Sequence, residues 1–197
     1  MHSVRRAVNE TIGEISENPF GFHSEADCHA ILYNHLRSEF PELYETAFGQ
    51  RTTLVHCEYF GRRPDERIDL VVLSPQDVRN IDVHFLAKRT PRPPGYEPAS
   101  LQAAIEIKTN LGGRGDRMTE YVVSDLGKLE AVRQAQPGFT VDLYFLYILR
   151  WPTRDSEARR RESGRVARIA NLCESRGVEF GTNKPETWFP EVPAPRT

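Results

Sequence analysis

Ala103-Ala104-Ile105-Glu106-Ile107-Lys108-Thr109-Asn110 is the stretch that decides the fold of this chain. Its aliphatic residues predict a short buried strand, yet a carboxylate and an ammonium lie two residues apart within it. Successive strand residues point to opposite faces, so Glu106 and Lys108 share one face while Ile105 and Ile107 share the other. Burial of two charged groups in a sheet is costly unless neighbouring groups compensate them. We therefore expect a partner for these charges nearby.

A second apolar stretch supplies a candidate partner. Residues 67–73, Arg-Ile-Asp-Leu-Val-Val-Leu, read as another buried strand with one carboxylate, Asp69. Asp65, four residues earlier, follows a proline in a predicted turn, where an aspartate with a solvated side chain is common and needs no functional role. We therefore prefer Asp69 to Asp65 as the functional carboxylate.

Together these groups predict a divalent-metal site for phosphodiester cleavage. Mg²⁺ prefers oxygen ligands and keeps several waters, so the carboxylates of Asp69 and Glu106 are enough to hold one ion, with the Ile107 carbonyl as a third ligand. Lys108, on the same face as Glu106, can orient or deprotonate the attacking water and offset negative charge.

The order of predicted elements is helix, a three-strand antiparallel meander, helix, strand, helix, strand, with a further short helix at residues 3–16. This order predicts one mixed sheet flanked by helices, in the α/β (α+β) class, within a single domain over 1–197. Its core spans about 23–180, with an insertion at 74–100 and a loop-like tail at 184–197. The predicted helices are 25–38, 119–136 and 154–176, and the strands are 52–60, 67–73, 103–109, 141–150 and 178–180.

Composition describes a globular chain without a strong bias toward one partner. Of the 197 residues, 39% are hydrophobic and 27% are charged, and the net charge is −2, so any nucleic-acid site would be a local basic patch. Three dispersed cysteines predict neither disulfides nor a zinc cluster. His23, His29 and His35 are six residues apart, which does not align them on one helix face, and we interpret them as ordinary core or surface residues. No apolar run is long enough for a membrane span, and we expect a cytoplasmic protein.

Asp69 followed by Glu106-Ile107-Lys108, with an acidic helix before the meander, resembles the PD-(D/E)xK nuclease superfamily, in a small and poorly characterised form. The resemblance covers about residues 23–180. It implies a restriction-endonuclease-like fold and Mg²⁺-dependent nucleic-acid cleavage, with Mn²⁺ as a substitute. It also implies Asp69 and Glu106 as metal ligands, Lys108 as the catalytic lysine, and Glu25 as an extra acidic ligand or a supporting residue.

Simpler interpretations remain for several of these residues. Glu106 and Lys108 are also compatible with a solvated cross-strand pair, as in an unrelated α/β module. Glu25 is also typical of an acid in the first turn of a helix behind the N-cap Ser24. Asp125 and Lys128, three residues apart, are typical of a surface ion pair, and Glu58 is typical of an exposed strand residue.

Basic residues near the motif are candidates for phosphate contacts, and we expect DNA rather than RNA as the partner. Arg114 and Arg117 follow the motif strand directly, whereas Arg161, Arg165 and Arg168 share one face of the 154–176 helix with Arg154. A non-catalytic subunit of the same fold, which binds nucleic acid or serves assembly, is the alternative function. A homodimer and a separate partner protein are both compatible with the sequence.

Overall fold

The computed structural model describes residues 2–18, 21–60, 67–80, 100–110, 117–149 and 156–183. A five-stranded mixed sheet forms its centre, with the strand order β3-β4-β5-β6-β7. The first three strands pair antiparallel, and β5, β6 and β7 pair parallel. The strands are β3 (Val55–Phe60), β4 (Arg67–Leu73), β5 (Leu101–Thr109), β6 (Asp142–Ile148) and β7 (Glu179–Thr182).

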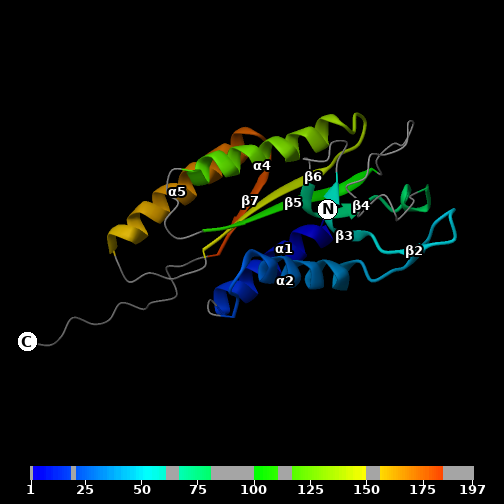
Figure 1. Cartoon of the computed structure of the whole chain (residues 1–197), viewed down its shortest axis with the longest axis horizontal. Helices are drawn as coiled ribbons and strands as arrows, with labels where there is room; N and C mark the ends of the chain where they lie inside the picture. The colour runs from blue at the N-terminus through cyan, green and yellow to red at the C-terminus, as the bar shows by residue number, and fades with distance from the viewer. Residues whose placement is uncertain are drawn as a thin grey trace, which may run out of the picture.

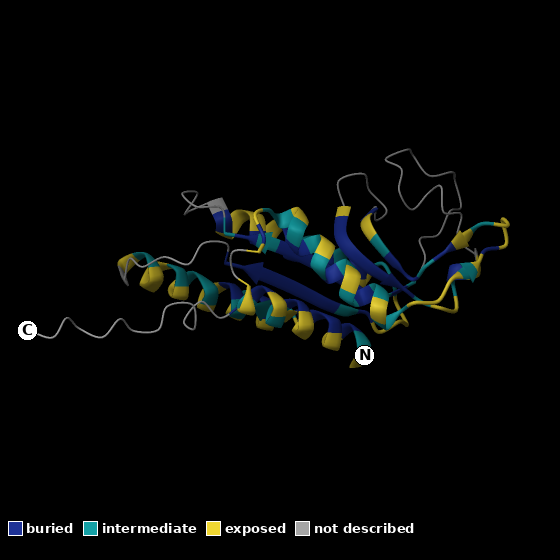
Figure 2. Cartoon of the chain, turned by 90° about the horizontal axis from the view of Figure 1, so that it is seen from below, coloured by how far each residue is buried: buried dark blue, intermediate teal, exposed yellow. Residues whose placement is uncertain are grey.

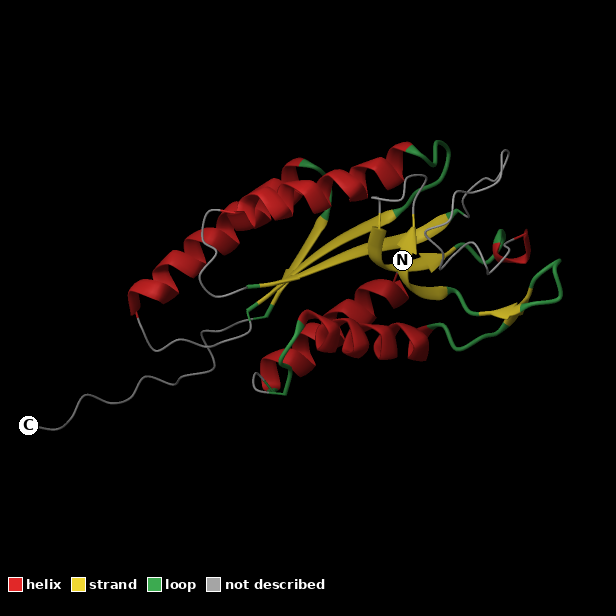
Figure 3. Ribbon diagram, viewed as in Figure 1, coloured by secondary structure: helices red, strands yellow, loops and turns green. Residues whose placement is uncertain are grey.

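Helices cover both faces of this sheet (Figure 1, Figure 3). On one face lie α1 (His2–Glu17) and α2 (Glu25–Glu39), and on the other lie α4 (Arg117–Gln134) and α5 (Ser156–Ser175). Figure 2 shows the consequence, with buried strands in the middle and exposed residues along the outer sides of the helices. The described residues thus form a layered mixed α/β structure, which confirms the predicted class.

The motif strand β5 lies in the middle of the sheet, between β4 and β6. Its aliphatic residues are fully buried, and so is Glu106, whose relative exposure is 0%. The interpretation of Glu106 and Lys108 as a solvated surface pair is therefore wrong, because both faces of the central strand are covered by helices.

The start of α2 is fixed by a capping box. The hydroxyl of Ser24 accepts a hydrogen bond from the amide of Asp27 at 3.2 Å, and the Asp27 carboxylate accepts from the Ser24 amide at 2.8 Å. Such caps satisfy amides that the helix leaves unpaired and set the direction in which the chain enters. The N-cap prediction is confirmed, and the cap fixes the first turn, which carries Glu25.

Close packing of α1 on β7 depends on Gly181. A β-carbon at this position would lie 2.6 Å from Leu146 Cδ2 and 2.7 Å from Ile12 Cδ1, closer than real contacts allow. The absence of a side chain therefore lets the helix approach the edge strand.

The first predicted strand, 52–60, needs a correction. Thr52 belongs to β2 (Arg51–Thr52), which pairs with β1 (Tyr44–Glu45) in a separate two-stranded sheet, and β3 begins only at Val55. The Thr53 hydroxyl donates to the carbonyl of Val55, and His56 Nε2 lies 2.8 Å from the Thr53 carbonyl, so local bonds replace the ladder here.

Two other predicted segments fall largely outside the described residues. Of the 74–100 insertion, 81–99 lie outside them, and the described part contains a 3-10 turn, η1 (Val78–Asn80). The tail at 184–197 also lies outside them. None of the described helices has the length and apolar character that a membrane span requires.

Candidate metal centre

The centre forms where β4 and β5 stop pairing. The register between these strands runs through Leu70 and Ile105, and the next residue of β4 is Asp69. Its Oδ2 accepts a hydrogen bond from the amide of Ile107 at 2.8 Å, so a side chain takes the place of the backbone ladder. Asp69 is 6% exposed. This arrangement holds the carboxylate between the two strands, where groups from both faces of the sheet can reach it.

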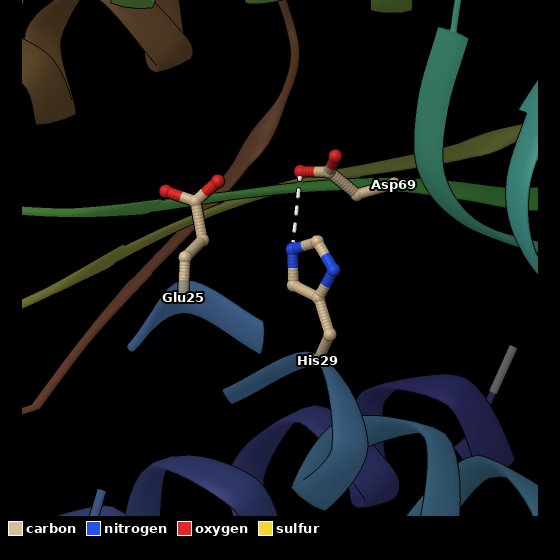
Figure 4. A group of neighbouring side chains, drawn as sticks. All are labelled: Glu25, His29 and Asp69. Atoms are coloured by element: carbon tan, nitrogen blue, oxygen red, sulfur yellow. Dashed lines mark ion pairs between the residues drawn. The ribbon is translucent and has the colours of Figure 1, made fainter. Parts of the chain in front are cut away.

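Helix α2 brings two more ligand groups to Asp69. Glu25 and His29 are one helical turn apart and therefore lie on one face of α2. Their ligand atoms and that of Asp69 all lie within 4.8 Å of one another, and His29 Nε2 is 3.5 Å from Asp69 Oδ2 (Figure 4). These three side chains could hold a metal ion. Burial favours the neutral form of Asp69, but His29, the Ile107 amide and Lys108 outweigh it and lower the Asp69 pKa.

Glu106 is a second buried carboxyl group, on β5 beside the strand that carries Asp69. Both of its oxygens lack a hydrogen-bond partner among the described residues. Its nearest cation is Lys128 on α4, with Nζ 3.6 Å from Oε1. Burial, together with the charges of Asp69 and Asp125, raises the pKa of Glu106 to about 10. Lys128 thus compensates the charged form of Glu106 only in part.

Lys108 points from the same strand toward a second buried acid. Its Nζ lies 3.1 Å from Asp125 Oδ2 on α4 and 3.7 Å from Glu25 Oε1 on α2. Burial lowers the pKa of Lys108, but the charges of Asp125, Glu25 and Asp69 outweigh burial and the net shift is upward. Lys108 therefore bridges helices from the two sides of the sheet as a cation.

Unpaired buried polar atoms concentrate in this region. Within the described part of the chain, five buried side-chain atoms that have no hydrogen-bond partner belong to His29, Glu106, Thr109 and Asp125, which line or adjoin the group described above. Native proteins rarely leave such atoms unpaired, and those that do occur often mark sites for an ion, water or substrate.

The backbone is also unusual beside Asp69. Glu58 on β3 has a φ of +53°, in the left-handed region that favours glycine. The pairs Cys57–Leu70 and Tyr59–Ile68 flank it, so Glu58 lies across from Asp69. Its side chain is exposed and pairs with Arg67 at 3.1 Å, as expected for an exposed strand residue.

The structure brings together four residues predicted from the sequence: Glu25, Asp69, Glu106 and Lys108. Glu25 does more than favour the helix dipole, because its Oε2 also accepts from the Thr109 amide at 3.3 Å. A metal contact by the Ile107 carbonyl stays a prediction. Asp65 lies outside the described residues.

Two features of the surroundings go beyond what the sequence predicted. His29 faces Asp69 and belongs to a group that could hold a metal ion; the usable signal was its spacing of four from Glu25, not its spacing from other histidines. Asp125 and Lys128 do form an ion pair at 2.5 Å, but Asp125 is 4% exposed. Asp125 also pairs with Lys108, and Lys128 lies 3.6 Å from Glu106, so both residues belong to the buried group and not to the surface.

The predicted nucleic-acid contacts are only partly described. Arg114 and the side chain of Arg117 lie outside the described residues. Arg161 and Arg168 are exposed on α5, whereas Arg165 is half-buried and pairs with Glu162 at 2.7 Å. Arg168 lines an open depression between α4 and α5 with Thr119, Asn171 and Leu172. The two exposed arginines are thus the described members available to a phosphate.

Comparison with known proteins adds no relative. A scan against protein-family models, a search of curated proteins and a search of solved structures each returned no match for this chain.

Proposed function

We propose that this chain is a divalent-metal-dependent nuclease that hydrolyses phosphodiester bonds of DNA. Glu106 carries the proposal: it is a fully buried carboxyl group, unpaired by hydrogen bonds among the described residues, next to the Glu25, His29 and Asp69 group. Such a group costs folding free energy unless a ligand compensates it. A cation shared by Asp69 and Glu106 would supply that compensation.

The residues present fit an oxygen-rich cation site with one nitrogen. Glu25, His29 and Asp69 would hold the ion, because their ligand atoms all lie within 4.8 Å of one another. Glu106 lies outside that group of three and would share the ion from β5. When bound, a divalent ion generates a nucleophilic water at neutral pH and stabilises charge on the phosphate. Mg²⁺ prefers oxygen ligands, whereas first-row transition metals also accept imidazole nitrogen. We therefore expect Mn²⁺ to support cleavage at least as well as Mg²⁺.

Lys108 has the position and charge of the second participant in hydrolysis. Its raised pKa keeps the ammonium protonated at neutral pH. A protonated lysine cannot accept a proton from water, so its role is to donate a hydrogen bond to the attacking water or to a phosphate oxygen. It also offsets the negative charge that develops on the phosphate.

The element order supports the wider family proposal. A PD-(D/E)xK nuclease with a restriction-endonuclease-like fold would have a helix, an antiparallel meander and a parallel unit. Its acidic pair would lie where two strands of the meander separate, as Asp69 and Glu106 do at β4 and β5. DNA would meet the centre through basic residues, with Arg161 and Arg168 on α5 and Arg114 and Arg117 after β5 as the candidates.

Cleavage of DNA by matched variants tests the proposal. Supercoiled plasmid and single-stranded DNA are incubated with Mg²⁺ or Mn²⁺ and with wild type, Asp69→Asn, Lys108→Met or Glu58→Gln. Glu58 is the control because it is an exposed carboxylate directly across from Asp69. We expect Asp69→Asn and Lys108→Met each to lose at least about a thousandfold, roughly 4 kcal/mol of transition-state stabilisation, and Glu58→Gln to cut normally.

Two outcomes would contradict the proposal in different ways. Equal cutting by all four proteins would refute the site. Wild type that binds Mn²⁺ and DNA but cuts neither substrate would favour the non-catalytic subunit.

A further inference from the structure

Helix α4 contributes an ion pair that the proposed reaction does not use. Lys128 Nζ lies 2.5 Å from Asp125 Oδ1 and 3.6 Å from Glu106 Oε1. Its side chain is 25% exposed, whereas the two acids that it contacts are 5% and 0% exposed. The ammonium is therefore held between two buried carboxyl groups.

A cation held between acidic side chains is also what a two-metal site contains. In such sites, acidic residues hold two divalent ions about 3.5–4 Å apart. Here α2 brings Glu25 and His29 to Asp69, and Lys128 of α4 contacts Glu106 of β5 and Asp125 of α4. Lys128 places a single positive charge between two of these acids, Glu106 and Asp125.

Formal charges agree with a single divalent ion. With all four acids ionised, as binding of a cation requires, the four carboxylates and two lysines give a formal charge of −4 plus +2, or −2, with His29 counted as neutral. One divalent ion brings the sum to zero, and a second would leave an excess of +2 in a largely buried site. The residues counted are Glu25, Asp69, Glu106, Asp125, Lys108 and Lys128.

We propose that the Lys128 ammonium, anchored by Asp125 against Glu106, takes the place of a second divalent cation, so that the centre binds one metal ion. This inference rests on the proposed function, because it takes the Glu25, His29 and Asp69 group to be the metal site. Asp125 is a positioning residue, since its two oxygens hold Lys108 and Lys128 separately.

Isothermal titration of the full chain with Mn²⁺ alone tests the inference without relying on cleavage. Wild type should bind one equivalent. Lys128→Met, which keeps the length of the side chain but removes its charge, should bind two, because Glu106 and the Asp125 oxygen that held Lys128 then lose their cation and can share a second ion. Lys128→Arg keeps the cation and should bind one. Arg160→Met, which removes an exposed cation of α5, is the matched control and should also bind one.

Each outcome decides the inference. Two equivalents in wild type, or a single equivalent in a folded Lys128→Met, would overturn it while the metal centre itself stands. No binding to wild type would instead remove the metal centre and the inference together. Far-UV circular dichroism checks that Lys128→Met is folded. If it is not, Lys128→Gln takes its place. The stoichiometry of the wild type tests the inference even without a variant.

Discussion

At the scale of single residues, the centre combines groups whose charges are well compensated with one, Glu106, whose charge is compensated only in part. Asp69 accepts from a backbone amide and faces His29, and its pKa is lowered. Glu106, on the next strand, has no hydrogen bond from the described residues, and its pKa is raised to about 10. Two neighbouring carboxyl groups with opposite pKa shifts are typical of functional sites, where different surroundings give chemically similar acids different pKa values.

The raised pKa of Glu106 predicts a pH dependence of stability in the metal-free protein. Between the ordinary pKa of 4.5 and the folded value of about 10, the folded state holds one proton more than the unfolded state. The free energy of unfolding therefore falls as pH rises through this window. We expect the Tm of the metal-free chain to decrease from about pH 6 to about pH 9, and Glu106→Gln to reduce this decrease. Differential scanning calorimetry in a chelating buffer measures it; an identical slope in wild type and Glu106→Gln would contradict the assignment.

His29 predicts a change in metal preference. Its imidazole is the only nitrogen donor in the Glu25, His29 and Asp69 group. Removing it by His29→Ala should weaken Mn²⁺ binding by roughly tenfold or more and weaken Mg²⁺ binding less, because Mg²⁺ prefers oxygen. Titration calorimetry with each ion gives the two affinities, and His35→Ala is a control on the same helix. Equal weakening for both ions would show that His29 is not a ligand.

At the scale of elements, the site depends on how closely helices approach the sheet. The capping box fixes the first turn of α2, which carries Glu25, and the separation of β4 from β5 makes room for Asp69. On the far edge, α1 packs on β7 through Gly181. The centre is therefore assembled from four elements, α2, β4, β5 and α4, and none of them contains it alone.

A pair of glycine substitutions tests this packing. Gly181→Ala places a β-carbon within 2.7 Å of both Leu146 and Ile12, so we expect a loss of about 1–3 kcal/mol in the free energy of unfolding. Gly164→Ala in α5 has no atom within 4 Å of the new carbon and should stabilise the chain by up to about 1 kcal/mol. Urea unfolding of both variants gives the comparison, and a neutral Gly181→Ala would show that the helix can move away freely.

At the scale of the whole molecule, periodicity and element order predicted the mixed sheet and the approximate bounds of its main strands and helices. Parity within β5 placed Glu106 and Lys108 on one face, and apolar neighbours distinguished Asp69 from an ordinary turn acid. The contributions of α2 and α4 were harder to predict. The approach of His29 and the burial of Asp125 depend on how each helix packs on the sheet, and local spacing does not encode that packing.

The central claim is that α2, β4 and β5 together form one divalent-metal centre. Anomalous diffraction from crystals of the full chain grown with Mn²⁺ tests it most directly. We expect one anomalous peak within coordination distance of Asp69 and of the Glu25 or His29 side chain, and its loss in Asp69→Asn. A peak remote from these side chains, or none in a crystal of the folded protein, would contradict it.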